Sequence, residues 1–409
     1  MHDAKSHYLT LLDQPLEALS PEPVRLPLIS FVLRNWNYAG YVGCAIDSIR
    51  AQDYPRFEAI VVDNGSTDES REVIDRHVDS DPRFQVVHTD ENLGPMGGVI
   101  RGLDAANGTF VAFVDSDDYL MPSFASAHVQ VHLALARNVA LTSSNVIEIG
   151  ADGAVLAGGK ADFVPNASHS DVVGLRAAFA VPRLSSISDE MYARLSEATI
   201  AFVPWRDGWL WGNGSSHMFR KFVLEMIRPL CGKDTMARLA ADSFFTGLAH
   251  VIGGTAQINL PLSACRIHDK NFFAASSSLS HFDYGTGTAA AYFEVRRRES
   301  ARAVLDRAET FNQRTRGRLW NALDRSLTAD GGDLRQQIST PEMRTILARN
   351  LSALFTCFGP STALRELRNR MGYAALYATM KEAYGGHVPG ALRRKLLRLE
   401  IRRALRKKR

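Results

Sequence analysis

The chain has 409 residues, of which 45% are hydrophobic and 22% are charged, and these proportions exclude a disordered or collagen-like protein. At about 150 residues per domain, the length allows two or three domains. The sequence shows neither the ~20 consecutive apolar residues of a transmembrane helix nor a secretory signal, so we expect a cytoplasmic protein. The four cysteines form no CxxC pair, which favours reduced thiols over a zinc cluster or disulfides.

The net charge of +4 hides an uneven distribution. Residues 392–409 carry ten lysines and arginines against one acid, and residues 1–391 carry 38 basic and 43 acidic side chains. The body of the protein is therefore mildly acidic, so we expect no nucleic-acid partner.

Residues 1–26 are a polar lead-in, and buried strands alternate with helices after it. Apolar runs of the buried-strand type lie at residues 26–33, 57–63, 84–88 and 109–115. Segments with helical spacing separate these runs, which predicts βαβ units and a mostly parallel sheet. Such a sheet binds its ligands beyond the carboxyl ends of its strands.

Further elements follow the same patterns. Ser66 lies three residues before Glu69, a capping-box spacing that predicts a helix from there to about Val78. Residues 139–150 and 257–268 have strand character, and residues 222–252 have helical character. From about residue 289 the chain becomes helical and charged. Thr340 and Pro341 predict a helix start, and an apolar stripe follows at helical spacing.

Acidic side chains stand where predicted strands end. Asp63 ends the second strand, Asp115 and Asp117 end the fourth, and Asp242 comes later in the chain. Their carboxylates should meet at one edge of the sheet, where hard oxygen ligands suit Mg²⁺ or Mn²⁺. Taken alone, the Asp-Ser-Asp-Asp run at 115–118 is better explained as a turn or helix cap, since Asp and Ser favour both.

Residues 28–125 resemble the family 2 glycosyltransferases of GT-A fold, because a whole set of motifs matches in order and spacing. The matching residues are Trp36, Asn37, Ser48, Gln52, Asp63, Asn64, Gly65, Ser66, Thr67, Asp68, Asn92, Gly94, Gly102, Ala106, Gly108, Asp115, Ser116, Asp117, Asp118 and Pro122. The resemblance implies an α/β, Rossmann-like fold with a mostly parallel sheet flanked by helices. The expected domains are a GT-A domain at 27–288, a helical C-terminal region at 289–391 and a basic tail at 392–409.

The resemblance also implies roles in donor binding. Asp63 would accept a hydrogen bond from the nucleotide base, and Asn35 and Asn37 would line the same pocket. Asp115 would face the ribose or the donor sugar. Asp117 would bind Mn²⁺ or Mg²⁺ bridging the diphosphate, which stabilises the leaving group.

Two motifs depart from the family pattern. In the first, Arg34 and Asn35 replace the Pro and Thr of the family's turn after the first strand. The family often has Ala-Arg-Asn after Asn-x-Gly, and that arginine helps to hold the diphosphate. Here the three positions are Gly98, Val99 and Ile100, and the nearest cation is Arg101. Either Arg101 acts from a shifted position, or the metal and other cations suffice.

The second half resembles the family more loosely. Asp242 matches the catalytic base, which would take the proton of the acceptor hydroxyl in one inverting displacement. The alternative is an acid favoured by a helix N-terminus. His268 matches a metal or diphosphate contact, or has a structural role. Trp209 and Trp211 suit an acceptor platform or a hydrophobic core equally well.

The expected function is inverting, metal-dependent transfer from a nucleotide-diphosphate sugar, with a UDP-sugar as the expected donor. The acceptor would be a hydroxyl of a glycan, a lipid-linked glycan or an envelope polysaccharide. The alternative is a catalytically degenerate sugar-nucleotide-binding scaffold in a polysaccharide assembly. A nucleotidyltransferase is disfavoured, because the basic glycine-rich loop that it needs after the first strand is absent.

The basic tail suggests peripheral attachment to the inner face of the membrane. At 100° per residue, Leu392, Leu396 and Leu399 lie on one side of a helix, and Leu397 and Ile401 lie nearly opposite. This arrangement is poor for a helix lying in a bilayer surface, and it suits packing on both sides or a protein contact equally well.

Overall fold

The computed structural model describes residues 10–11, 14–15, 25–135, 138–158, 172–174, 184, 186–202, 204, 211–271, 289–328 and 332–407. The chain divides into two compact units. Unit 1 comprises Met1–Met226 and Gly232–Tyr292, and unit 2 comprises Ile227–Cys231 and Phe293–Arg409.

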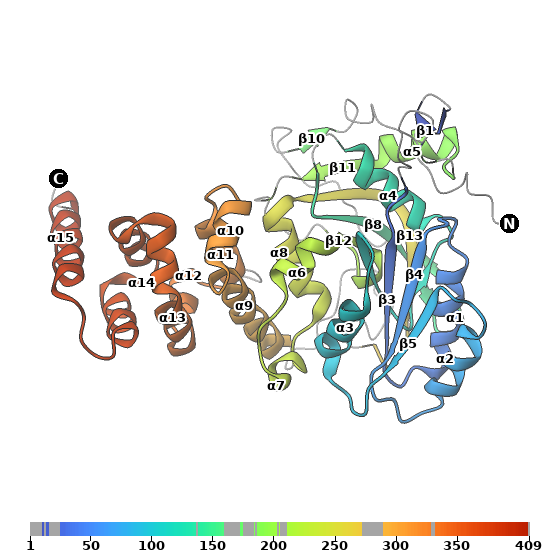
Figure 1. The fold of residues 1–409 in the computed structure, drawn as a ribbon, viewed down its shortest axis with the longest axis horizontal. Helices are drawn as coiled ribbons and strands as arrows, with labels where there is room; N and C mark the ends of the chain where they lie inside the picture. Colours follow the sequence, from blue (N-terminus) through green and yellow to red (C-terminus); the bar gives the residue numbers. More distant parts are fainter. Residues whose placement is uncertain are drawn as a thin grey trace. The chain divides into compact units, whose positions relative to one another are not determined.

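Unit 1 is built on a mixed sheet, which has eleven strands in the described part of the chain (Figure 1). Four neighbouring strands are parallel and lie in the order β5-β4-β3-β6. Their bounds are Phe84–His88 for β5, Phe57–Asp63 for β4, Ile29–Asn35 for β3 and Phe110–Asp115 for β6.

Beyond β6 the sheet contains antiparallel pairs. β12 (His217–Arg220) lies antiparallel to both β6 and β8 (Leu141–Gly150), and β8 pairs in parallel with β13 (Thr255–Ile267). The shorter strands of this sheet are β7 (Tyr119–Leu120), β9 (Val155–Ala157), β10 (Val172–Gly174) and β11 (Thr199–Phe202). β1 (Thr10–Leu11) and β2 (Gln14–Pro15) form a separate pair.

Helices cover both faces of the parallel strands because alternate strand residues point to opposite sides. On one face, Phe31 and Leu33 share a core with α1 (Ala39–Arg50), α2 (Ser70–Val78) and α4 (Phe124–Ala134). On the other face, α3 (Gly94–Ala105) lies over Val32. Phe113 packs on the same face against Phe245 of α8 (Ala241–Gly253).

The predicted α/β class and its parallel strands are confirmed, and β4 and β5 have the predicted bounds. The capping-box prediction is wrong, because α2 begins at Ser70 and the Ser66 hydroxyl accepts hydrogen bonds from Asn35 Nδ2 and Asn37 N instead. The helical stretch predicted at 222–252 is three helices, α6 (Lys221–Ile227), α7 (Lys233–Met236) and α8. α5 (Asp189–Ala198) precedes β11, and the short η5 (Gly214–Ser216) precedes β12.

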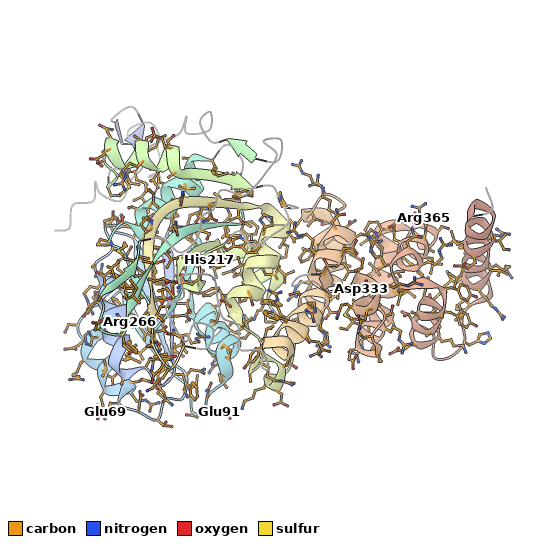
Figure 2. The ribbon with its side chains drawn as sticks, turned by 180° about the vertical axis from the view of Figure 1, so that it is seen from behind. Glu69, Glu91, His217, Arg266, Asp333 and Arg365 are labelled. Carbon is orange, nitrogen blue, oxygen red and sulfur yellow. The ribbon has the colours of Figure 1, made fainter. Side chains whose placement is uncertain are left out.

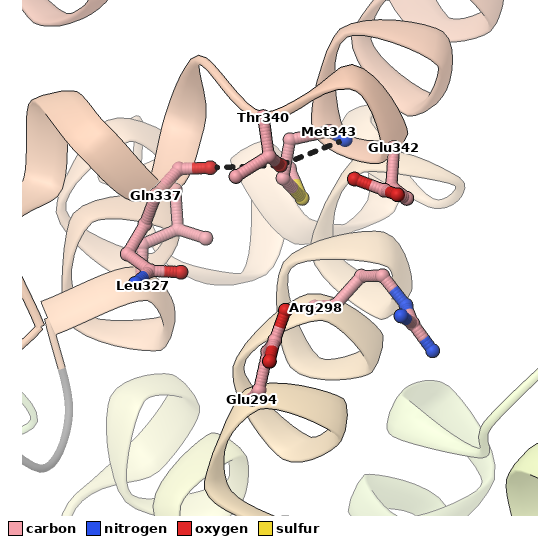
Figure 3. A pocket seen from close by; sticks show the side chains of 7 residues that line it. All are labelled: Glu294, Arg298, Leu327, Gln337, Thr340, Glu342 and Met343. Atoms are coloured by element: carbon pink, nitrogen blue, oxygen red, sulfur yellow. Dashed lines mark hydrogen bonds between the residues drawn. The ribbon is translucent and has the colours of Figure 1, made fainter. Parts of the chain in front are cut away.

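The predicted helical C-terminal region is confirmed. Its helices are α9 (Ala289–Leu305), α10 (Ala308–Arg314), α11 (Leu319–Thr328), α12 (Leu334–Ile338), α13 (Pro341–Phe358), α14 (Pro360–Ala383) and α15 (Gly390–Lys407). As predicted, Thr340 caps α13, since its hydroxyl accepts the Met343 N–H at 3.3 Å and donates to the Gln337 carbonyl at 3.2 Å (Figure 3). Over the described ranges, none of the helices has the length and apolar character needed to span a membrane.

Candidate functional site

The parallel register brings the predicted site residues to one edge of the sheet. Asn35 at the end of β3 is paired with Asp63 at the end of β4, and Arg34 is paired with Asp115 at the end of β6. Because all three strands end together, polar side chains follow one another along the carboxyl edge.

Asp115 and Asp242, which are far apart in the sequence, meet at this edge across Gly214. A Cβ added at position 214 would lie 3.2 Å from Asp115 Oδ2 and 3.4 Å from Asp242 Cβ. Gly214 begins the short turn η5 before β12, and Asp242 lies in the first turn of α8. A side chain at position 214 would therefore press on both aspartates.

The crowding of acids perturbs their protonation. Burial raises the pKa of Asp115 to about 6, with help from the charges of Asp117 and Asp242 and against the opposing charge of Arg34, although 40% of the Asp115 side-chain surface is accessible. Burial, and then Asp117 and Asp115, also hold the pKa of Asp118 well above its ordinary value. A cation at this edge would relieve the repulsion.

Asp117 and His268 are brought together as predicted. His268 Nε2 lies 3.1 Å from Asp117 Oδ2, and Asn271 Nδ2 donates to the same oxygen at 3.3 Å. His268 Nδ1 accepts the backbone N–H of Lys270 at 3.1 Å. In the neutral ring the proton is therefore on Nε2, which donates to Asp117. This arrangement favours an orienting role for His268, and its metal-ligand role stays a prediction.

Aromatic rings and Arg266 support this pair. The His268 ring stacks on Tyr41 at 4.9 Å between centroids, and the tilted ring of Tyr38 lies 5.5 Å from it. Arg266, labelled in Figure 2, donates from Nε to the Asp117 carbonyl at 3.0 Å, and its backbone N–H donates to Asp118 Oδ1 at 3.2 Å. The loop at 115–118 is thus fastened to the end of β13.

The residues at this edge fit a divalent cation only in part. Among the described residues, no three or more His, Cys, Asp and Glu side chains form a metal-binding group. Both side-chain hydrogen bonds described above reach Oδ2 of Asp117, and a carboxylate oxygen is a ligand that Mg²⁺ and Mn²⁺ prefer. These ions commonly use one or two carboxylates and complete their shell with waters and substrate phosphates. The donor set fits an ion held together with a diphosphate.

Asp63, the predicted contact of the nucleotide base, ends β4. Its side chain is fully buried, and its Oδ2 accepts from Arg71 at 3.2 Å and lies 3.3 Å from His88 Nδ1. Burial opposes ionisation of Asp63, but hydrogen bonds from Ser66, His88 and Arg71 outweigh it and lower the pKa. The Arg71 side chain is 52% exposed, and the contact of Asp63 with a base stays a prediction.

Asn35 and Asn37 build the neighbouring turn. Asn35 is buried and donates to the Ser66 hydroxyl at 3.1 Å. Asn37 has φ of 59° and accepts the Thr67 N–H at 2.7 Å through its side chain. Both residues fasten the β3 turn to the β4 turn, and their contact with a nucleotide stays a prediction.

Two other predicted positions, Arg101 and Trp211, are not brought to this edge. Arg101 is exposed on α3. Trp211 is only 6% exposed, and its Nε1 donates to Thr255 Oγ1 at 3.1 Å, so it belongs to the core. We therefore do not assign Trp211 to an acceptor platform. Trp209 lies outside the described residues.

Arg34 was missed as a site residue. It donates to Asp115 Oδ1 at 2.7 Å. The sequence shows Arg34 only as a departure from the family motif, and the signal that could have found it is the register of two parallel strands.

Part of this chain is similar to known proteins. Residues 30–182 match the model of glycosyl transferase family 2. The chain is 33% identical over 122 residues to an uncharacterized glycosyltransferase of Haemophilus influenzae, and this match covers 30% of this chain and 48% of that protein. The chain is 30% identical over 125 residues to the succinoglycan biosynthesis protein ExoO of Rhizobium meliloti. This match covers 31% of this chain and 35% of that protein. The chain thus spans less than half the length of these relatives.

Solved structures resemble this chain distantly. S. aureus TarS in complex with UDP is 14% identical with a TM-score of 0.43, and the match covers 88% of each chain. The mannosyltransferase PcManGT of Pyrobaculum calidifontis in complex with GDP-Man and Mn²⁺ is 18% identical with a TM-score of 0.38, and covers 90% of each chain.

Proposed function

We propose that the protein transfers a sugar from a nucleotide-diphosphate sugar to a hydroxyl acceptor with inversion at the anomeric carbon. The observation that carries this proposal is the meeting of Asp115 and Asp242 across Gly214. A scaffold that only binds a sugar nucleotide needs the donor-side residues but has no need of a second carboxylate on the acceptor side.

In this proposal the donor lies along the carboxyl edge of β4, β3 and β6. Its base would occupy the pocket above Asp63 and contact Arg71, the exposed group there. Asp115 would accept a hydrogen bond from a ribose or sugar hydroxyl, because its side chain is partly accessible. Asp117 would hold Mn²⁺ or Mg²⁺ oriented by His268 and Asn271. The bound ion would neutralise negative charge on the diphosphate.

Asp242 would act as the general base. Its Oδ1 accepts the backbone N–H of Ser243 at 2.6 Å, which fixes the carboxylate, and its Cβ lies beside Gly214. The acceptor oxygen forms a bond to the anomeric carbon while its proton moves to Asp242. The bond from that carbon to the diphosphate breaks, and the nucleoside diphosphate leaves with the electron pair. One in-line displacement inverts the configuration and needs no covalent intermediate.

We propose a polysaccharide or lipid-linked glycan as the acceptor. The support is the similarity to a succinoglycan biosynthesis protein over residues of the same domain. A nucleoside diphosphate-release assay with UDP-, GDP-, dTDP- and CDP-sugars, followed by NMR of the product linkage, tests the function. The proposal predicts metal-dependent release and inversion at the anomeric carbon. Retention of configuration would overturn the single-displacement mechanism.

We also propose that α15 attaches the protein to an anionic membrane surface. Leu396 is buried, and Arg368 of α14 donates to the Leu399 carbonyl at 2.6 Å, so one side of α15 packs within unit 2. Leu397 and Ile401 on the opposite side are 53% and 52% exposed. The two apolar sides that argued against a surface helix thus have different roles.

Exposed cations surround the free apolar pair of α15, namely Arg393, Arg394, Lys395 and Arg398. Such a face suits the boundary of a bilayer with anionic lipids. Flotation with phosphatidylcholine vesicles, with and without phosphatidylglycerol, should show binding only to the anionic vesicles. The double change Leu397→Gln and Ile401→Gln should abolish it, and Leu230→Gln, at a residue that is 56% exposed elsewhere, should not. Binding that survives the double change would contradict the proposal.

A further inference from the structure

We infer that Arg34 is a donor-binding residue whose guanidinium receives the diphosphate, and that it reaches the site across Gly98. This inference rests on the proposed function, since it assigns the diphosphate partner within the same site.

The position of Arg34 is set by the sheet. Arg34 is the penultimate residue of β3, and the parallel register pairs it with Asp115 of β6. Its NH2 group donates to Asp115 Oδ1 at 2.7 Å, and 26% of its side-chain surface is accessible. The guanidinium therefore lies at the carboxyl edge and is open to an incoming ligand.

Helix α3 leaves room for the Arg34 side chain because residue 98 is glycine. A Cβ at position 98 would lie 2.9 Å from Arg34 Cγ and 3.2 Å from Cδ. One turn further along, a Cβ at Gly102 would lie 2.2 Å from Val32 Cγ1. The two glycines let α3 lie directly on β3, with the stem of Arg34 in the space that a side chain at 98 would fill.

This arrangement explains why α3 can lack a diphosphate-binding cation of its own. Val99 and Ile100 are 4% and 6% exposed, so both belong to the core, and Arg101 is exposed. The cation comes from β3 instead. Arg34 and Gly98 look like two separate departures from the family motif. They form a pair, because the stem of Arg34 occupies the space that the missing side chain of Gly98 leaves.

The negative charges at the carboxyl edge make a cation necessary for binding a diphosphate there. Asp115, Asp117 and Asp242 would repel a diphosphate. Without a donor, Arg34 neutralises Asp115. A diphosphate carries more charge than one carboxylate and offers oxygens for a bidentate pair with the planar guanidinium. When Arg34 turns to the diphosphate, it releases Asp115 to accept a hydrogen bond from a donor hydroxyl.

The test compares Arg34→Met with Arg101→Met, which removes the same charge from the exposed face of α3. Calorimetry with Mn²⁺ measures the affinity for UDP, GDP, dTDP and CDP and for the corresponding nucleoside monophosphates. Arg34→Met should weaken binding of the preferred diphosphate by about 10- to 100-fold, because a charge-assisted hydrogen bond is lost. Affinity for the monophosphate should change by less than about 3-fold, Arg34→Lys should fall between, and Arg101→Met should resemble the wild type.

A second variant guards against misfolding. Gly98→Ala keeps the charge but displaces the Arg34 stem, so it should also weaken diphosphate binding, and it should have no further effect in the Arg34→Met background. The inference is overturned if Arg34→Met binds the diphosphate as tightly as the wild type does. It is also overturned if Arg34→Met and Arg101→Met weaken binding equally. Either result leaves the proposed function standing. A wild-type protein that binds none of the four diphosphates would overturn both.

Discussion

The carboxylates of Asp115 and Asp242 lie in different local settings although they share one site. Asp115 ends a buried strand and is paired with Arg34. Asp242 lies in the first turn of a helix, and its Oδ1 accepts the backbone N–H of Ser243 at 2.6 Å. The first setting suits a group that binds, and the second leaves a carboxylate without a cationic partner named above to neutralise it.

Replacement of Asp242 separates binding from chemistry. Asp242→Asn keeps the size of the side chain but cannot take a proton. We expect transfer to an acceptor to fall by about 10²- to 10⁴-fold, which is the range for general base catalysis, while the affinity for the donor stays unchanged. Steady-state transfer rates and calorimetric donor binding measure the two effects. Near-wild-type transfer would show that Asp242 is not the base.

Gly214 tests the geometry of the same pair. A methyl group at 214 would crowd Asp115 Oδ2 at 3.2 Å and fill the space next to Asp242. Gly214→Ala should therefore reduce transfer by at least about 10-fold, since misplacement near 1 Å can cost about 10² in rate. Gly232→Ala is the matched control, because a Cβ there meets no atom within 4 Å. Equal activity of the two variants would remove Gly214 from the site.

Much of the site edge could be predicted from the sequence, because strand-end acids are visible as polar residues after apolar runs. Asp63, Asp115 and Asp117 follow that pattern. Arg34 could not be predicted, since its role depends on which strands are neighbours. Ser66 has the spacing of a helix cap, but its hydroxyl is used by the β3 turn, a long-range contact that local spacing does not encode.

At the scale of elements, α4 and β12 bury three histidines away from the site. His128 Nδ1 contacts Thr142 Oγ1 at 2.6 Å, and His132 Nε2 contacts the Met218 carbonyl at 3.0 Å. His217, labelled in Figure 2, is 1% exposed. Burial lowers the pKa of His132 and of His217 to about 3, and lowers that of His128 well below 6.5. All three are neutral in the folded protein near pH 7.

These histidines should make the fold sensitive to acid. The unfolded chain binds protons near pH 6.5, whereas the folded protein does not until about pH 3, so stability is lost as the pH falls below 6.5. Each histidine contributes up to about 1.4 kcal/mol per pH unit. Urea unfolding at pH 7.5 and pH 5 should show a smaller loss for His217→Phe than for the wild type. His387→Gln, at an exposed position, should match the wild type, and a loss of equal size in all three proteins would contradict the assignment.

Element boundaries followed from the sequence where an apolar run is bounded by polar residues, as in β4 and β5. Boundaries that depend on tertiary contacts did not follow from the sequence. Residues 222–252 have continuous helical character, yet the chain breaks there into α6, α7 and α8, and the break sets Asp242 at a helix start. The apolar sides of α15 were visible from spacing, but only packing against α14 shows which side is covered.

At the scale of the whole molecule, the proposed site extends beyond the matched part of the family. The family match ends at residue 182, whereas Asp242, Arg266 and His268 come later in the chain. The sheet joins the two parts, because β12 connects β6 to β8 and β13 follows in parallel. Donor residues and the proposed base therefore depend on one continuous sheet in unit 1.

Thermal unfolding of the full chain with UDP, GDP, dTDP and CDP, each with and without Mn²⁺ or Mg²⁺, tests whether a nucleotide binds at the carboxyl edge together with a metal. A ligand at 100 times its dissociation constant adds about 2.7 kcal/mol of stability. We predict that one nucleotide stabilises the wild type strongly only when metal is present. Asp117→Ala should remove the metal-dependent part of this stabilisation. If none of the four nucleotides stabilises the protein under any of these conditions, the account of a sugar-nucleotide site at this edge is contradicted.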